Sequence, residues 1–247
     1  MIADNDAYID AFGYVNPTMM MVDPNNSGNV YICQKGQTVG NIHKSTDGGV
    51  TWAGTELLPD NSPVWSMAIN ASDSNIIYVS RNDKGDTTYR GVVKTTDGGS
   101  SWTSAGLSDQ VIGLVVMASD NENVLYAGTE EATVEVSAKL YKTIDGGNNW
   151  TDITPSGSSG YFVAIAIDSS DSNIVYAGTE SGYLYKSTDG SSNWTLLTNA
   201  FISVKTLMIG SLYAGTGGGL YKYSPDTSSP DTSSSGSSSG CFIDTVR

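Results

Sequence analysis

The sequence predicts an all-β fold of repeated four-stranded units, and two observations support this prediction. The first is an octapeptide that occurs four times, each time with an aspartate five positions before a tryptophan. The second is a pair of strand-like segments before every copy, one alternating between apolar and polar residues and one containing a tyrosine. The aspartates recur every 44 to 50 residues, a period typical of arrays in which each repeat is one supersecondary unit. Four short strands in such a period are typical of a β-propeller blade.

The octapeptide predicts a tight turn between two antiparallel strands. An aspartate side chain accepts hydrogen bonds from the backbone amides that follow it, and the glycine after it supplies a positive φ angle. The tryptophan begins the next strand, where its ring can wedge between adjacent repeats. We therefore expect the repeated aspartates and tryptophans to be structural: Asp47, Trp52, Asp97, Trp102, Asp145, Trp150, Asp189 and Trp194.

The strands of each repeat follow one order along the chain. An alternating strand A is followed by a polar turn, then by strand B with its tyrosine, then by a hairpin and strand C, which ends in the octapeptide. Strand D starts at the tryptophan. Four repeats of this kind span residues 18–58, 63–107, 111–154 and 161–198. In the first repeat, the methionine run 19–21 is expected to pack in the core.

The fifth repeat, residues 204–225, departs from this pattern. It supplies strands A, B and C but has no octapeptide and no strand D. We expect the strand-like residues 8–15 to supply the fourth strand, closing a five-bladed ring and removing an exposed sheet edge. Two alternatives stay open: the chain is part of a longer propeller, or residues 8–15 insert into a neighbouring molecule. Strand exchange of the second kind would build a dimer or a filament.

The octapeptide resembles the pattern S/T-x-D-x-G-x-T/S-W of the Asp-box, also called the bacterial neuraminidase repeat. This resemblance covers residues 18–223. It implies a β-propeller like those of sialidases, sortilin-type receptors, large xyloglucan hydrolases and photosystem II assembly-factor-like proteins. The local form YAGT…LYKSTDG is most similar to the last group and to related exported bacterial proteins. The resemblance is specific for the fold and does not specify a function.

Composition limits the partners. The chain carries 12 Lys and Arg against 26 Asp and Glu, a net charge of -14, which disfavours nucleic acid and anionic membrane surfaces as partners. No apolar run approaches the length of a membrane span, and the first residues do not form a signal peptide. We expect an exported bacterial protein, extracellular or at the cell surface, whose acidity keeps it soluble. Of the two cysteines, Cys33 is expected to be a small buried core residue and Cys241 lies in the tail.

Three segments are expected along the chain. Residues 1–17 form an N-terminal segment with the closing strand, and residues 18–225 form the propeller. Residues 226–247 form a flexible Ser/Gly-rich tail ending in a Cys-Phe-Ile segment. The tail resembles C-terminal sorting or anchoring segments of some exported bacterial proteins, and a disordered end is the alternative. Self-assembly through the N-terminal strand or the tail is a further partner hypothesis.

Candidate binding residues are those where the repeats differ most, in the hairpins between strands B and C. In propellers these hairpins share one face with the D-to-A connections, opposite the octapeptide turns. The candidates combine both charges with two tyrosines: Arg81, Asp83, Asp86, Tyr89, Arg90, Glu130, Glu131, Glu135, Glu180 and Tyr183. We expect them to recognise a protein or a glycan, and solvated hairpin tips are the alternative.

Catalytic motifs are weak by comparison. Sialidase chemistry needs three arginines around the substrate carboxylate, whereas two lie within the repeats. A glycosidase needs two carboxylates across a cleft, for which Glu130 with Glu135, or Glu131 with Glu180, are candidates. His43 is the single histidine, and no metal site or cofactor is predicted. The leading hypothesis is a non-catalytic exported scaffold that binds a protein or glycan or self-assembles. The alternatives are a glycoside hydrolase using acidic loop residues and a structural subunit of an extracellular filament.

Overall fold

The computed structural model describes residues 17–34, 41–52, 57–58, 62–82, 90–130, 138–199, 201, 203–208, 213–224 and 242–245. These residues form 19 strands in five antiparallel sheets and no helix, which confirms the all-β propeller fold predicted from the repeats. The chain divides into two compact parts, Met1–Ile153 and Thr154–Arg247, which are described separately.

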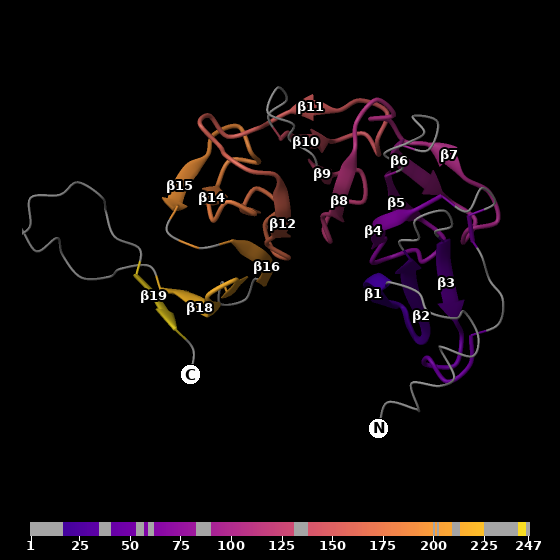
Figure 1. Cartoon of the computed structure of the whole chain (residues 1–247). Coiled ribbons are helices and arrows are strands. Elements are labelled where there is room, and N and C mark those ends of the chain that lie inside the picture. Colours follow the sequence, from indigo (N-terminus) through magenta and orange to yellow (C-terminus); the bar gives the residue numbers. More distant parts are fainter. Residues whose placement is uncertain are drawn as a thin grey trace, which may run out of the picture. The chain divides into compact units, whose positions relative to one another are not determined.

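The N-terminal part contains three sheets whose strands pair in chain order (Figure 1). The first sheet consists of β1 (Pro17–Asp23), β2 (Asn26–Gln34) and β3 (Asn41–Ser45). The second consists of β4 (Val64–Ile69), β5 (Ile77–Asn82), β6 (Arg90–Thr95) and β7 (Thr103–Ser104). The third consists of β8 (Ile112–Met117), β9 (Leu125–Thr129), β10 (Leu140–Thr143) and β11 (Thr151–Asp152).

The C-terminal part contains two further sheets with the same order of pairing. The fourth sheet consists of β12 (Phe162–Ile167), β13 (Val175–Thr179), β14 (Leu184–Ser187) and β15 (Thr195–Thr198). The fifth consists of β16 (Val204–Met208), β17 (Tyr213–Thr216), β18 (Gly219–Ser224) and β19 (Phe242–Thr245).

The fourth strand of the fifth sheet corrects the sequence-based assignment. That position was expected for residues 8–15, but β19 occupies it and pairs with β18 from Tyr221↔Thr245 to Ser224↔Phe242. A fourth strand needs little sequence, since β7 and β11 have two residues each. Because the entropy lost on closing a loop grows slowly with its length, a segment beyond a long connection can supply it. Residues 1–16, and with them the expected N-terminal strand, lie outside the described residues.

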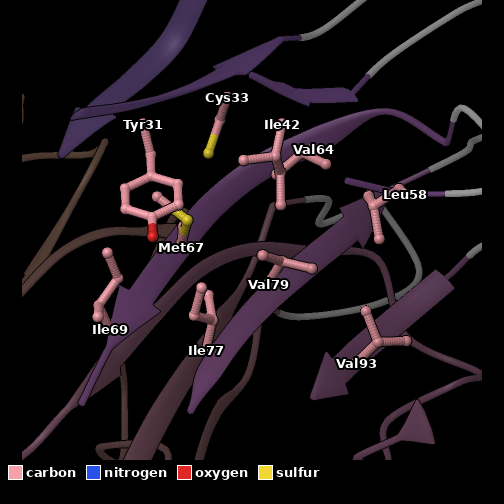
Figure 2. Close-up of a cluster of buried hydrophobic side chains, with 10 residues drawn as sticks. All are labelled: Tyr31, Cys33, Ile42, Leu58, Val64, Met67, Ile69, Ile77, Val79 and Val93. Atoms are coloured by element: carbon pink, nitrogen blue, oxygen red, sulfur yellow. The ribbon is translucent and has the colours of Figure 1, made fainter. Parts of the chain in front are cut away.

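Neighbouring sheets in the N-terminal part pack face to face through apolar side chains (Figure 2). Tyr31 and Cys33 of the first sheet share one buried cluster with Met67 and Ile69 of the second. Cys33 is fully buried, and burial raises the pKa of its thiol to about 12, so it is a core residue as expected. The methionine run is different from the prediction: Met19 and Met21 pack against this core, but Met20 is 68% exposed.

Each sheet also holds one lysine of strand C over the tyrosine ring of strand B. The distance from Nζ to the ring centroid is 5.2 Å for Lys44 and Tyr31 and 5.0 Å for Lys94 and Tyr78. The same cation–π pair recurs in the other three sheets, as Lys142 with Tyr126, Lys186 with Tyr176 and Lys222 with Tyr213. Five of the 12 cationic side chains are therefore used inside the repeat.

We expect Gly106→Ala to lower the free energy of unfolding by more than about 2 kcal/mol. Gly106 has a φ of 91°, and a β-carbon there would lie 2.8 Å from the Trp150 ring. Gly157 is a matched control, because its φ is 73° but a β-carbon there meets nothing within 4 Å. Gly157→Ala is expected to cost about 1 kcal/mol, from backbone strain alone. Urea unfolding followed by far-UV circular dichroism measures both, and equal losses would contradict the close packing at Gly106.

Candidate functional site

The two ends of each sheet carry different chemistry. The octapeptide turn and the A-to-B turn lie at the same end, because a glycine amide of the octapeptide donates to a carbonyl of the A-to-B turn. The pairs are Gly48 with Gly28, Gly98 with Asn75, Gly146 with Asn123 and Gly190 with Asn173, at 2.8 to 3.1 Å. We call this the turn end. The opposite end, where strand B turns into strand C, is the hairpin end.

At the turn end, each octapeptide aspartate is bonded within its own turn. Asp97 Oδ1 accepts from the Thr95 hydroxyl at 2.7 Å and from the Ser101 amide at 2.8 Å, and its Oδ2 accepts from the Ser101 hydroxyl at 2.6 Å. The Thr95 hydroxyl also accepts from the Gly99 amide at 3.0 Å. The same bonds recur around Asp47, Asp145 and Asp189.

These bonds stabilise the ionised carboxylate. The seventh residue of the octapeptide donates hydrogen bonds to the aspartate from its side chain and its amide. The Ser or Thr hydroxyl at the first position donates another. Together these bonds lower the pKa of the aspartate to about 2. This holds for Asp47, Asp97, Asp145 and Asp189. Both carboxylate oxygens of each aspartate therefore accept hydrogen bonds inside its own turn.

Two of the octapeptide tryptophans, Trp102 and Trp150, link neighbouring sheets. The indole of Trp102 in the second sheet donates to the carbonyl of Leu57 at 2.8 Å, just after the first sheet. The indole of Trp150 donates to the carbonyl of Ala105 at 2.7 Å, after β7 of the second sheet. Both rings pack against the buried clusters between those sheets. The predicted wedge role is therefore observed in the N-terminal part.

At the hairpin end of the second sheet, two of the predicted arginines flank one loop. Arg81 lies at the end of β5, opposite Val64 of β4 and Gly91 of β6. Arg90 begins β6, opposite Asn82. Both arginine side chains are partly buried. The structure therefore brings Arg81 and Arg90 to the same end of one sheet, while Asp83, Asp86 and Tyr89 lie outside the described residues.

The third sheet places Glu130 at its hairpin end. The Glu130 amide donates to the carbonyl of Val111 at 2.9 Å, which closes the strand pair of β8 and β9. The side chain passes over Gly113, where a β-carbon would come within 2.8 Å of Glu130 Cβ. Glu131 and Glu135 lie outside the described residues. Beyond that loop, Lys139 forms an ion pair with Asp152 at 2.8 Å.

In the C-terminal part, Glu180 and Tyr183 flank one tight hairpin of the fourth sheet. The Glu180 amide donates to the carbonyl of Tyr161 at 3.0 Å, as the Glu130 amide does to Val111 in the third sheet. The Thr179 amide donates to the Tyr183 carbonyl at 2.9 Å and closes the hairpin. The Tyr183 ring stacks on Tyr185, with centroids 6.1 Å apart and ring planes 13° apart.

Strand A carries a β-bulge in every sheet, which the sequence analysis missed. The register shifts at the second residue of β1, β4, β8, β12 and β16, at Thr18, Trp65, Gly113, Val163 and Lys205. Bulges re-aim side chains and are frequent beside functional sites. Trp65 is the one tryptophan outside the octapeptides, and it follows Val64, the partner of Arg81. Its position outside the octapeptide pattern was the signal that could have drawn attention to it.

The described residues were also considered for a metal site and a membrane span. Within them, no group of three or more His, Cys, Asp or Glu side chains is placed to hold a metal ion. The described part of the chain also contains no helix of the length and apolarity needed to cross a bilayer.

No protein-family model and no curated protein matches this sequence. Solved structures match it at low identity. A GH74 enzyme of Niastella koreensis is 20% identical with a TM-score of 0.66, over 83% of this chain and 36% of the enzyme. YCF48 bound to a D1 peptide is 17% identical with a TM-score of 0.59, over 86% of this chain and 64% of that one.

Two more solved structures share this fold. YCF48 of Cyanidioschyzon merolae is 16% identical with a TM-score of 0.59, over 93% of this chain and 71% of that one. The GH74 xyloglucanase of Xanthomonas campestris is 14% identical with a TM-score of 0.52, over 84% of this chain and 44% of the enzyme. The chain thus spans about a third of the first enzyme and less than two thirds of the peptide-bound YCF48. At this identity the likeness establishes the fold and leaves the function open.

Proposed function

We propose that the chain is a non-catalytic, exported propeller scaffold that binds a protein partner through the hairpin ends of its sheets. The octapeptide turns are its Asp-box motifs. One observation carries the proposal: the repeated aspartates are bonded within their own turns, whereas the side chains that differ between repeats lie at the other end. On a repetitive scaffold, recognition belongs to the positions that break the repeat.

The chemistry at the hairpin ends suits a peptide. Arg81 and Arg90 offer charged donors for carboxylates and backbone carbonyls, and Arg and Trp are enriched among residues that dominate protein interfaces. Trp65 adds an aromatic residue next in the chain to Val64, the register partner of Arg81. YCF48, which shares the fold, has been solved with a D1 peptide bound, so a propeller of this type accommodates a peptide.

A glycoside hydrolase is the second candidate, because two of the similar structures are GH74 enzymes. Hydrolysis of a glycosidic bond needs an acid and a second carboxylate about 5 to 10 Å apart. Glu130 in the third sheet and Glu180 in the fourth are the predicted carboxylates among the described residues. Each of these glutamates is a candidate for the acid or the second carboxylate. An assay of hydrolysis beside an assay of peptide binding therefore distinguishes the two functions.

A peptide-display library and a glycan array, both screened with the purified chain, test the proposal. We expect selected peptides to bind, and Arg90→Ala to weaken the affinity for a synthetic peptide at least about tenfold, as loss of an interface arginine does. Val50→Ala, at an exposed residue of the first octapeptide turn, is the control that should leave binding unchanged.

Binding to glycans alone would contradict a protein partner. Release of reducing ends from xyloglucan by the chain, lost in Glu130→Gln, would establish the hydrolase instead. Isothermal titration measures peptide affinity, and analysis of released sugars measures hydrolysis. Both use the same protein preparations. The circular dichroism spectrum of each preparation identifies a variant that is misfolded.

A further inference from the structure

All four Asp-Gly bonds of the chain lie in the octapeptides, which places a reactive dipeptide in every octapeptide turn. They join Asp47 to Gly48, Asp97 to Gly98, Asp145 to Gly146 and Asp189 to Gly190. Of all aspartyl bonds, Asp-Gly rearranges most readily to isoaspartate in unstructured peptides, because glycine has no side chain to shield its amide nitrogen from the aspartate. The octapeptide turns therefore hold four bonds whose reactivity depends on the local geometry.

The rearrangement needs no reagent other than water. The glycine nitrogen attacks Cγ of the preceding aspartate, and a C–N bond forms. The amide proton and the hydroxyl of the protonated carboxyl group leave as water, which gives a cyclic succinimide. A second water then opens the ring. Opening at the former backbone carbonyl produces isoaspartate, in which Cβ has become part of the main chain.

The folded sheet engages the nitrogen that would attack. The Gly98 amide donates to the Asn75 carbonyl at 3.1 Å, and the Gly48, Gly146 and Gly190 amides donate to equivalent carbonyls at 2.8 to 3.0 Å. Each acceptor belongs to the A-to-B turn of the same sheet, so the bond depends on the pairing of strands B and C. The nitrogen must break this bond before it can lose its proton and form a bond to Cγ.

The turn also fixes the carboxylate that would be attacked. Asp97 Oδ1 accepts from Thr95 and Ser101, and its Oδ2 accepts from the Ser101 hydroxyl, so Cγ cannot move freely toward the Gly98 nitrogen. The same bonds, with that from the Ser101 hydroxyl first, lower the pKa of Asp97 to about 2 from an ordinary value of 3.8. At about pH 5 the protonated, reactive form is therefore reduced more than tenfold.

We propose that the four octapeptides are latent sites of isoaspartate formation, which the folded turns keep unreactive and which react when a turn opens. Isoaspartate adds one carbon to the main chain and moves the carboxylate to the α-carbon. An octapeptide altered in this way loses the geometry that bonds Asp97 to Thr95 and Ser101. A chain that reacts while unfolded is therefore impaired in refolding, which makes its unfolding irreversible. None of this chemistry depends on partner binding at the hairpin ends.

Enzymatic methylation with protein L-isoaspartyl methyltransferase measures isoaspartate, and peptide mapping by mass spectrometry assigns it to each octapeptide. The full chain is incubated near neutral pH, folded in buffer and unfolded in urea. We expect the unfolded chain to accumulate isoaspartate at least about tenfold faster at all four Asp-Gly bonds, because the reaction follows the population of open turns. Equal rates in the two conditions, whether high or low, would overturn the proposal.

Ser101→Ala tests the protection within one turn. It removes the hydroxyl that donates to Asp97 Oδ2 and keeps the amide that donates to Oδ1. In the folded chain we expect isoaspartate to form at Asp97 at least about threefold faster, the effect of losing one hydrogen bond. The rates at the other three aspartates should stay unchanged and serve as internal references. Ser100→Ala is the matched control, since the Ser100 hydroxyl donates to the Asp97 carbonyl and not to its carboxylate.

Three outcomes of this comparison contradict local protection by the turn. An unchanged rate at Asp97 in Ser101→Ala would show that the bonds to the carboxylate do not keep it unreactive. An equal rise at all four aspartates would show that the variant acts through unfolding of the whole chain. The same rise in Ser100→Ala would show that a looser turn, and not the loss of a bond to the carboxylate, is the cause.

Discussion

Trp150→Ala is expected to lower the free energy of unfolding by about 3 kcal/mol, which is the low end for a large buried aromatic because the ring is partly buried. The substitution removes the ring from the cluster between the second and third sheets and leaves the Ala105 carbonyl without its 2.7 Å donor. The loss should appear as a lower midpoint in urea unfolding followed by far-UV circular dichroism.

Trp150→Phe separates the two contributions. Phenylalanine keeps most of the apolar contact but cannot donate, so the expected loss is about 1 kcal/mol, the typical net value of one hydrogen bond. Trp52→Ala is a positional control: the Trp52 indole donates to Gly49 of its own turn, in the first sheet. A loss at Trp52 as large as that at Trp150 would show that the ring stabilises the turn and not the contact between sheets.

The second large effect is a loss of stability in acid. The pKa values of Asp47, Asp97, Asp145 and Asp189 lie at about 2 in the folded protein, below the ordinary value of 3.8. A group whose pKa is lowered by folding stabilises the folded state above its unfolded pKa. That stabilisation is lost as the pH falls through the folded pKa. We therefore expect the free energy of unfolding to fall steeply between about pH 4 and pH 2.

Urea unfolding at a series of pH values measures this dependence. The slope of the free energy of unfolding against pH reports the number of protons taken up on unfolding. In Asp97→Asn this number should fall by about one between pH 4 and pH 2, because one carboxylate has been removed. Asp109→Asn is the control, an exposed carboxylate outside the octapeptide turns. If the two variants flatten the limb equally, the hydrogen bonds of the turn are not the cause of the lowered pKa.

Local chemistry explains why so much of the fold could be predicted. The residues that bind Asp97, Thr95 and Ser101, lie two and four positions away in the sequence, so the octapeptide carries its own geometry. The wedge role of Trp150 followed from its size and its place in the period. Strand order in the second, third and fourth sheets followed as well, because successive strands there are joined by short connections.

Non-local choices were harder to predict. The alternation of residues 8–15 predicts a strand but does not indicate which strand it pairs with. The position beside β18 is occupied by β19, which has only four residues. The bulge at Trp65 also escaped prediction, because a shift of register depends on the pairing between β4 and β5 and not on a local motif. For the predicted binding residues, the structure places Arg81, Arg90, Glu130, Glu180 and Tyr183 at hairpin ends, and the others lie outside the described residues.

The tryptophan links have a consequence for how such a chain can change over evolutionary time. Trp102 and Trp150 donate to main-chain carbonyls of the preceding repeat, and every amino acid supplies that acceptor. A repeat can therefore exchange its side chains at these acceptor positions without releasing its neighbour. Duplication or deletion of a whole repeat would likewise leave each remaining indole with a main-chain carbonyl as its hydrogen-bond acceptor. The architecture can thus vary in repeat number and surface sequence while the joints between sheets stay the same.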